Sequence, residues 1–304
     1  MVEIAKVDGQ SQLKKFLLAL LGVSLIFIPI LHNLYKLSSA EELYSHLPLI
    51  PIVSGYLVWS MKSDLPEASM PRPWLSLIPA VLGCVAVGIT LLLQGSKIWP
   101  LVDYLAMMTF AYVLFIYSIA FCFLGADTIK SIQFPLAFLL CFVPLPIFAV
   151  NGLEAFFQYT SAEVAYWFID LADIPVLRES WLVFRLPTIS IQVASECSGI
   201  RSSLVLFIVS LVASHLFLHS QWKQIFLVFF VVPLAIARNA LRVATIAALC
   251  VHIGPEMIDS WVHKRGGPYF FALSMVPFMI VLYLLVRSDR KPNAISINEN
   301  KQNP

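Results

Sequence analysis

Long apolar segments dominate this sequence and limit it to folds that a lipid bilayer can hold. Eight of them are apolar enough, and nearly long enough, to cross a hydrocarbon core of about 30 Å as α-helices. They cover approximately residues 16–35, 46–61, 75–94, 101–124, 129–150, 200–218, 224–250 and 268–286. Of the 304 residues, 59% are hydrophobic and only 12% are charged, whereas water-soluble domains carry about 25% charged residues. The sequence therefore predicts an all-α polytopic membrane protein.

The remaining composition narrows the class further. A net charge of +2 with no run of Lys or Arg gives no basic surface for nucleic acid. No small-residue cleavage site follows the first apolar segment, which is therefore interpreted as a signal anchor. The segment 46–61 is short and interrupted by proline. Without internal repeats, residues 1–304 are predicted to form a single membrane domain with a polar cytoplasmic tail at 287–304.

Lysine and arginine predict the orientation of the helices. With the N-terminus inside, eleven of the 20 Lys and Arg residues fall in inner segments, six in outer segments and three within helices. Because cytoplasmic loops carry an excess of these residues, this arrangement is favoured over its inverse. An even number of spans also places both termini in the cytoplasm. We expect a multi-pass protein of the cell inner (plasma) membrane.

The longest outer segment, 151–196, is predicted to contain two kinds of structure. Residues 153–171 space apolar and aromatic side chains as an amphipathic helix at the membrane interface does. Residues 181–184 and 188–193 no longer have helical spacing of their apolar residues, and polar and apolar residues alternate in the second stretch. These two stretches predict a short β-hairpin interrupted near Pro187. This hairpin leads directly into the predicted sixth helix.

A cysteine opens that sixth helix, in the sequence Ser195–Arg201. At a helix N-terminus near water, Cys197 can ionise and attack a carbonyl. Gly199 allows another backbone to approach closely, and Arg201, one turn further on, favours the thiolate. Glu196 opposes it. Cys197 is thus a candidate nucleophile on the outer face.

Two alternatives for the cysteines stay open. In the first, Cys197 is an inert thiol. In the second, Cys197 forms a disulfide with Cys250 in an oxidising compartment. The other three cysteines fall inside predicted spans and are interpreted as small apolar residues: Cys84, Cys122 and Cys141.

The predicted seventh helix carries charges in an apolar run, Arg238–Arg242. Charged residues within a membrane helix normally face a polar cavity and serve function. At 1.5 Å per residue, Arg242 lies about 27 Å along a helix that starts near residue 224, close to the outer face. Arg238 lies one turn deeper on the same side. The alternative is a pair of structural arginines that extend toward the headgroups.

The last outer loop supplies a histidine, His263, followed by Gly266 and Gly267. A histidine near the headgroups can act as a general acid and base near neutral pH, and His252 is the competing candidate in this loop. Two further histidines, His215 and His219, fall at the inner end of the sixth helix. No paired-ligand spacing supports a metal site at Cys197, Cys250, His252 and His263, and no cofactor is expected.

Three short motifs in this order resemble the exosortase/archaeosortase family of membrane cysteine transpeptidases. They are Cys-Ser-Gly-Ile-Arg at 197–201, Asn-x-x-Arg from Asn239 to Arg242, and His-x-x-x-Gly from His263 to Gly267. The resemblance covers residues 100–286. It implies Cys197 as the nucleophile, with Arg242 and His263 as its catalytic partners, and gives no role to Arg238.

The resemblance also implies a substrate and a setting. The substrate is a secreted protein with a C-terminal sorting signal, made of a short motif such as Pro-Glu-Pro, a transmembrane helix and a basic tail. Cleavage at the outer face passes the protein through a thioester to an envelope acceptor such as a glycan or a lipid. From their positions in the sequence, and apart from the resemblance, four further residues are expected to support the site: Gly199, Arg201, Arg238 and Asn239. A rival hypothesis is a transporter or polysaccharide-export component whose intramembrane arginines bind an anion, which leaves Cys197 without a role.

Overall fold

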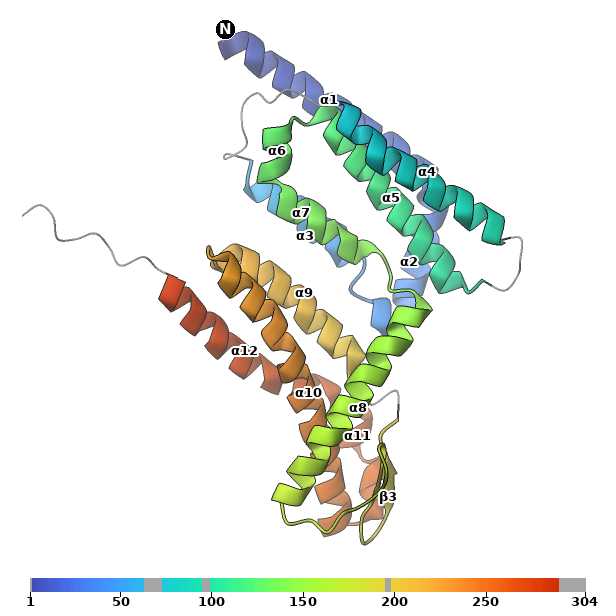
Figure 1. Ribbon diagram of the computed structural model, residues 1–304, viewed down its shortest axis with the longest axis vertical. Coiled ribbons are helices and arrows are strands. Elements are labelled where there is room, and N and C mark those ends of the chain that lie inside the picture. The colour runs from blue at the N-terminus through green and yellow to red at the C-terminus, as the bar shows by residue number, and fades with distance from the viewer. Residues whose placement is uncertain (1, 63–72, 95–98, 195–197, 290–304) are drawn as a thin grey trace, which may run out of the picture. The chain divides into compact units, whose positions relative to one another are not determined.

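The computed structural model describes residues 2–62, 73–94, 99–194 and 198–289, apart from the side chains of residues 2–10, Pro73, Gln94, His263 and Lys264. Helices make up most of it, and one small sheet accompanies them (Figure 1). The chain divides at Gly152 into two units, Met1–Gly152 and Leu153–Pro304. Every candidate site residue belongs to the second unit.

The first unit is all-helical. Its elements are α1 (Val2–Ile26), α2 (Ile28–Ala40), the 3-10 turn η1 (Glu42–Tyr44), α3 (Leu49–Ser60), α4 (Pro73–Gln94), α5 (Leu101–Phe123), α6 (Ala126–Ser131), α7 (Gln133–Phe138), the 3-10 turn η2 (Leu139–Phe142) and the start of α8 (Ile147–Leu171). Helix α5 is its most buried element and packs against α1 and α4.

The second unit continues α8 and adds the sheet and the C-terminal helices. Its elements are β1 (Leu177–Ser180), β2 (Val183–Arg185), β3 (Ser190–Gln192), α9 (Ile200–Phe217), α10 (Gln221–His252), the 3-10 turn η4 (Pro255–Asp259), α11 (Trp261–Arg265) and α12 (Gly267–Asp289).

Five predicted spans coincide with long apolar helices of the structure. Within the described part of the chain, five helices are long and apolar enough to cross a membrane, or up to seven spans if each of two bent helix pairs counts as one. The five are α4, α5, α9, α10 and α12. The protein is therefore a polytopic helical membrane protein, and the three other predicted spans differ from single straight helices.

The predicted span 16–35 bends by 70° between α1 and α2. Phe27 leaves the helical conformation at the bend, with φ −90° and ψ 6°. Pro29 follows two residues later and cannot donate the amide hydrogen bond that would continue α1 into α2. The predicted span 46–61 forms only the 12-residue helix α3, about 18 Å long, so it is too short to cross the bilayer core alone.

The predicted span 129–150 is wrong as a single helix. It is divided into α6, α7, η2 and the start of α8, and the axis turns by 92° between the α7–η2 segment and α8. Pro144 and Pro146 lack the amide protons that a continuous helix needs. Asp103 of α5 then accepts a hydrogen bond from the Ile147 amide at 2.7 Å and so satisfies a free donor at the start of α8.

The sheet of the second unit has three antiparallel strands in the order β1–β2–β3. Strand β2 overlaps the first of the two segments predicted as a hairpin, β3 lies within the second, and β1 is an additional strand. Phe184 pairs with Ile191 on the buried side of the sheet, and both belong to a cluster shared with α8 and α10. The predicted amphipathic helix 153–171 forms most of α8.

Polar contacts attach this sheet to its neighbouring helices. Gln158 of α8 donates from Nε2 to the carbonyl oxygen of Val193 at 2.7 Å, just after β3. Thr188, in the β2–β3 turn, donates from Oγ1 to the carbonyl oxygen of Cys250 in α10 at 3.2 Å. Arg178 of β1 pairs with Glu163 of α8 at 2.7 Å. The segment that leads into α9 therefore starts from a fixed position.

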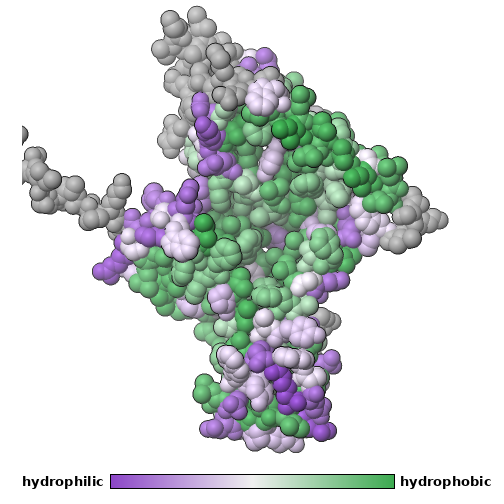
Figure 2. Space-filling model, in the orientation of Figure 1, coloured by the Kyte–Doolittle hydropathy of each residue, from purple (hydrophilic) through white to green (hydrophobic). Residues whose placement is uncertain are grey.

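Helices α9, α10 and α12 share a second apolar cluster, which includes Leu206, Leu227 and Phe278. In Figure 2 the surface of these helices is mostly apolar along the middle of the unit, and hydrophilic residues gather at the end that carries the sheet and near the C-terminal end of α12. Such an apolar band between two polar ends is typical of membrane-crossing helices.

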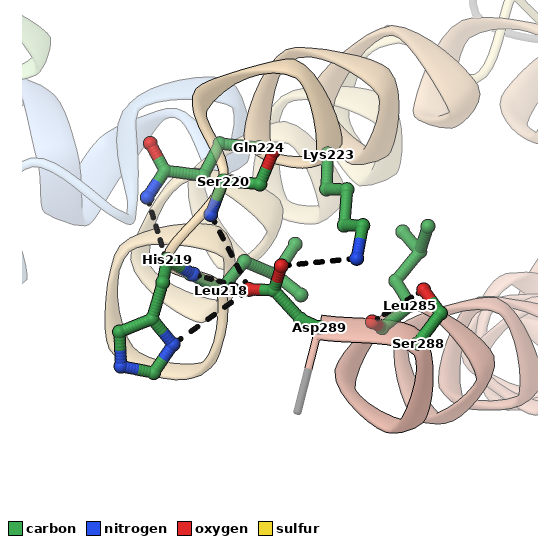
Figure 3. Close-up of polar contacts among 8 residues, drawn as sticks. All are labelled: Leu218, His219, Ser220, Lys223, Gln224, Leu285, Ser288 and Asp289. Carbon is green, nitrogen blue, oxygen red and sulfur yellow. Dashed lines mark hydrogen bonds and ion pairs between the residues drawn. The ribbon is translucent and has the colours of Figure 1, made fainter. Parts of the chain in front are cut away.

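One carboxylate fastens α12 to the turn between α9 and α10 (Figure 3). Asp289 Oδ2 accepts the backbone amides of His219 and Ser220 at 2.6 and 3.3 Å, and Oδ1 accepts Lys223 Nζ at 3.0 Å. These amides lie at the N-terminus of α10, where backbone donors are unsatisfied and negative charge is favourable. Asp289 therefore fixes the last turn of α12 against the start of α10.

We expect Asp289→Asn to lower the melting temperature of the detergent-solubilised protein by a few degrees, because the substitution removes the charge that the two amides and Lys223 share. Hydrogen exchange at the His219 and Ser220 amides should accelerate. Ser288→Ala is the matched control, since Ser288 Oγ donates only to Leu285 of its own helix. Equal melting temperatures for the two variants would contradict this role of Asp289.

Candidate functional site

The start of α9 is a tight, buried turn. Gly199 precedes the helix in the left-handed conformation, with φ 74° and ψ 13°, which side chains other than glycine rarely adopt. Ser198 is almost fully buried, and its Oγ accepts the Ile200 amide at 3.5 Å. Cys197, the predicted nucleophile, lies immediately before this turn in the sequence and outside the described residues.

The carbonyl oxygen of Gly199 accepts several hydrogen bonds. The Ser203 amide donates to it at 3.1 Å as the first bond of the helix. Ser203 Oγ donates at 2.8 Å, Ser202 Oγ at 3.1 Å, and Arg238 Nη2 of α10 at 3.1 Å. One carbonyl group at the head of α9 therefore joins two helices.

Arg238 and Asn239 hold this turn from the side of α10. Their exposed fractions are 7% and 2%. Arg238 Nη2 also lies 3.4 Å from Ser203 Oγ, while Arg238 Nη1 is buried without a hydrogen-bond partner among the described residues. A Cβ atom at Gly199 would lie 3.0 Å from both Arg238 Nη2 and Asn239 Oδ1. Glycine at 199 is thus required by its backbone conformation and by the close approach of α10.

The depth of Arg238 follows from its position along α10. Counted from Gln221 at 1.5 Å per residue, it lies about 26 Å along the helix. Burying a guanidinium inside a membrane protein is unfavourable unless polar groups receive it. The Gly199 carbonyl and the Ser203 hydroxyl supply such groups. Arg238 thus contacts polar groups at a helix terminus of the same chain.

The other predicted arginines lie nearby along the chain but differ in exposure. Arg242, the predicted essential arginine, is half-buried one helical turn beyond Arg238. Arg201 lies in the first turn of α9 and is exposed. The structure thus brings Gly199, Arg238 and Asn239 into contact and leaves Arg242 adjacent to them on the same helix.

His263 lies in the short helix α11, and its side chain falls outside the described part. Helix α11 contacts η4, which in turn contacts α10, and it also contacts α12. The competing His252 is exposed at the C-terminal end of α10. Cys250, the disulfide alternative, is a free cysteine with an exposed fraction of 0% in the cluster beneath the sheet.

Two groups of residues at this turn were missed by the sequence analysis. The hydroxyls of Ser202 and Ser203 bind the Gly199 carbonyl, and Gln158 of α8 holds the strand end that precedes the turn. The signal for the serines was present, because three hydroxyl residues lie within six positions at the head of an otherwise apolar helix. Gln158 carried no local signal, since its partner is a backbone carbonyl 35 positions away.

Comparison with known proteins identifies the family of this chain. The family model of the transmembrane exosortases matches residues 37–280. This range includes α9 and α10 with the turn between β3 and α9, as well as α11 and most of α12. No curated protein and no solved structure matches the chain. Because the family match spans more than half of the sequence, the chain belongs to the transmembrane exosortase family.

Proposed function

We propose that this protein is a cysteine transpeptidase that cleaves the C-terminal sorting signal of exported proteins at the outer face of the cell inner membrane. The observation that carries the proposal is the turn at Gly199, where two buried side chains of α10, Arg238 and Asn239, contact the residue that follows Cys197-Ser198. Membership of the exosortase family supports a cysteine-based reaction at this position.

The chemistry begins with the Cys197 thiol. Its proton passes to His263, and the thiolate attacks the scissile carbonyl of the substrate. Arg242 donates to the oxyanion that forms, a role worth about 3–4 kcal/mol in comparable sites. The carbon–nitrogen bond then breaks, His263 returns the proton to the departing amine, and a thioester remains on Cys197. A second nucleophile from the envelope, a glycan or a lipid, attacks the thioester and releases the thiol.

The substrate that suits this site carries a transmembrane helix and a basic tail after the cleaved motif. The tail stays in the cytoplasm, because Lys and Arg are retained on that side, and the helix then sets the scissile bond at the outer boundary. This arrangement requires both termini of the enzyme in the cytoplasm and α9 with its N-terminus toward the outside. The excess of Lys and Arg in the inner segments of the sequence supports that orientation.

Cys197→Ala should abolish cleavage of a co-expressed substrate that carries such a C-terminal signal, because no other group replaces the attacking thiolate. The measurements are the mobility of the substrate on an immunoblot and the released C-terminal peptide by mass spectrometry. Cys84→Ala is the matched control, since Cys84 is an exposed free cysteine on α4. Unchanged processing by Cys197→Ala, at equal enzyme abundance, would exclude the peptidase and favour the transport hypothesis.

The proposed roles, with Arg242 binding the oxyanion and His263 moving the proton, lead to a second prediction. Arg242→Lys should reduce the rate of thioester formation about 100- to 1000-fold, because the planar guanidinium of arginine offers paired donors that lysine lacks. His263→Ala should reduce it as well, by removing the general base. The measurement is the single-turnover yield of the substrate thioester, trapped in acid, with Arg185→Lys on β2 as control.

Full activity of Arg242→Lys together with complete loss of activity in His263→Ala would remove the oxyanion role from Arg242. The roles would then have to be exchanged, or the oxyanion assigned to backbone donors.

A further inference from the structure

Strand β3 is an edge of the sheet (Figure 1), and the hydrogen bonds at its two ends show which of its backbone groups face β2. At one end the Leu186 amide donates to the Ile189 carbonyl oxygen at 2.8 Å. At the other end the Val193 amide donates to the Leu182 carbonyl oxygen at 2.8 Å. Hydrogen-bonded and non-bonded positions alternate along an antiparallel pair. Positions 189, 191 and 193 therefore bond to β2.

The two positions between them point the other way. Ser190 and Gln192 lie in register with β2, but the alternation turns their amides and carbonyl oxygens toward the open edge. In the described part of the chain no strand lies beyond β3, and no hydrogen bond reaches these four backbone groups. Both residues are exposed. The edge of β3 therefore offers two donors and two acceptors to another strand.

The opposite edge of the sheet is protected. Strand β1 has a bulge between Arg178 and Ser180, and its charged side chains pair with Glu163 and with Arg185. Bulges and charges are the usual means by which an edge strand is kept from pairing with another chain. Strand β3, Ser190–Gln192, carries no charge and pairs with β2 without a bulge. The two edges thus differ in the features that govern strand addition.

The length of this edge limits what can occupy it. Three residues span about 10 Å, whereas a stable interface between two protein copies buries about 800 Å² on each of them. A second copy of the chain is therefore a poor occupant. A peptide on a protein that is already held at the membrane needs fewer contacts, because tethering raises its effective concentration to about the millimolar range. The transmembrane helix of the substrate provides such a tether under the proposed function, and β3 ends five residues before Cys197 in the sequence.

Resting on the proposed function, we propose that the edge of β3 binds an extended segment of the exported substrate as a fourth strand. The main chain of this segment bonds to the outward backbone groups of Ser190 and Gln192, as in other complexes formed by strand addition. Recognition through the backbone accepts many side chains, but it requires an amide proton at each residue of the segment that faces β3. The edge of β3 contributes to binding and takes no part in the covalent steps.

Disulfide cross-linking tests the contact without cleavage. Gln192→Cys is combined with Cys197→Ala, and single cysteines are placed along the segment of the co-expressed substrate that precedes its transmembrane helix. Side chains of neighbouring strands alternate between two faces, so the yield of cross-links to position 192 should rise and fall with a period of two residues. Glu179→Cys on the bulged strand β1 is the matched control and should show no such period. Cys197→Ala alone gives the background from the other cysteines.

Proline substitutions test the outward amides. Proline is tolerated at an edge position whose amide faces away from the sheet, so Gln192→Pro should fold. Gln192→Ala lacks the same side chain but keeps the amide. Relative to it, Gln192→Pro should raise the KM for purified substrate about 3- to 10-fold, the effect of one hydrogen bond, with little change in kcat. Ile191→Pro removes an amide that bonds to β2 and should instead lower the melting temperature.

The possible outcomes separate strand addition from the proposed function. A period of two on β3, together with no cleavage by the unmodified enzyme, would contradict the peptidase and leave strand addition standing. Normal cleavage without that period, or equal KM values for Gln192→Pro and Gln192→Ala, would overturn strand addition alone. Loss of the fold in Gln192→Pro would contradict the outward direction of its amide. Cross-links between two copies of Gln192→Cys, in place of those with substrate, would assign the edge to a second copy and also overturn the proposal.

Discussion

The hydrogen bond from Arg238 to the Gly199 carbonyl joins the two helices on which the candidate site depends. It places a buried charge of α10 against the N-terminus of α9, and this arrangement imposes conditions on both partners. Residue 199 must be glycine, because a Cβ would lie 3.0 Å from two side-chain atoms of α10. The carbonyl must turn toward α10, which the left-handed conformation of Gly199 permits. The turn at the head of α9 is thus held by a contact between the two helices.

The segment before the cysteine is held separately. Gln158 binds the Val193 carbonyl at the end of β3, and Thr188 ties the preceding turn to α10. Val193 at the end of β3 and Ser198 at the head of α9 are thus each held by contacts of their own.

The sequence alone predicted the parts of the fold that depend on composition and periodicity. The five spans that coincide with single long helices are predominantly apolar, so hydropathy was sufficient to find them. The spans that failed contain prolines whose effect depends on tertiary partners, such as Asp103, which receives the Ile147 amide after Pro146. Strand β1 was missed because its residues, Leu177–Ser180, show no alternation of polarity and pair only through β2.

The candidate site residues were proposed from chain position and charge. The contact of Arg238 with the Gly199 carbonyl was not predicted, because its partner is a backbone group 39 positions away. A family resemblance built on short motifs assigned Arg242 and left Arg238 unexplained, although Arg238 is the more buried of the two. The contact of Arg238 was recognised from its burial and its hydrogen-bond geometry, and neither can be read from a single sequence.

The capping of the α9–α10 turn by Asp289 sets a boundary for engineering the C-terminus. A deletion that ends before residue 289 takes away the acceptor for the His219 and Ser220 amides and the partner of Lys223. An affinity tag or fluorescent protein fused after it leaves all three contacts in place. A C-terminus shortened for engineering should therefore keep Asp289, so that the helices that carry Arg238 and Gly199 stay fastened to α12.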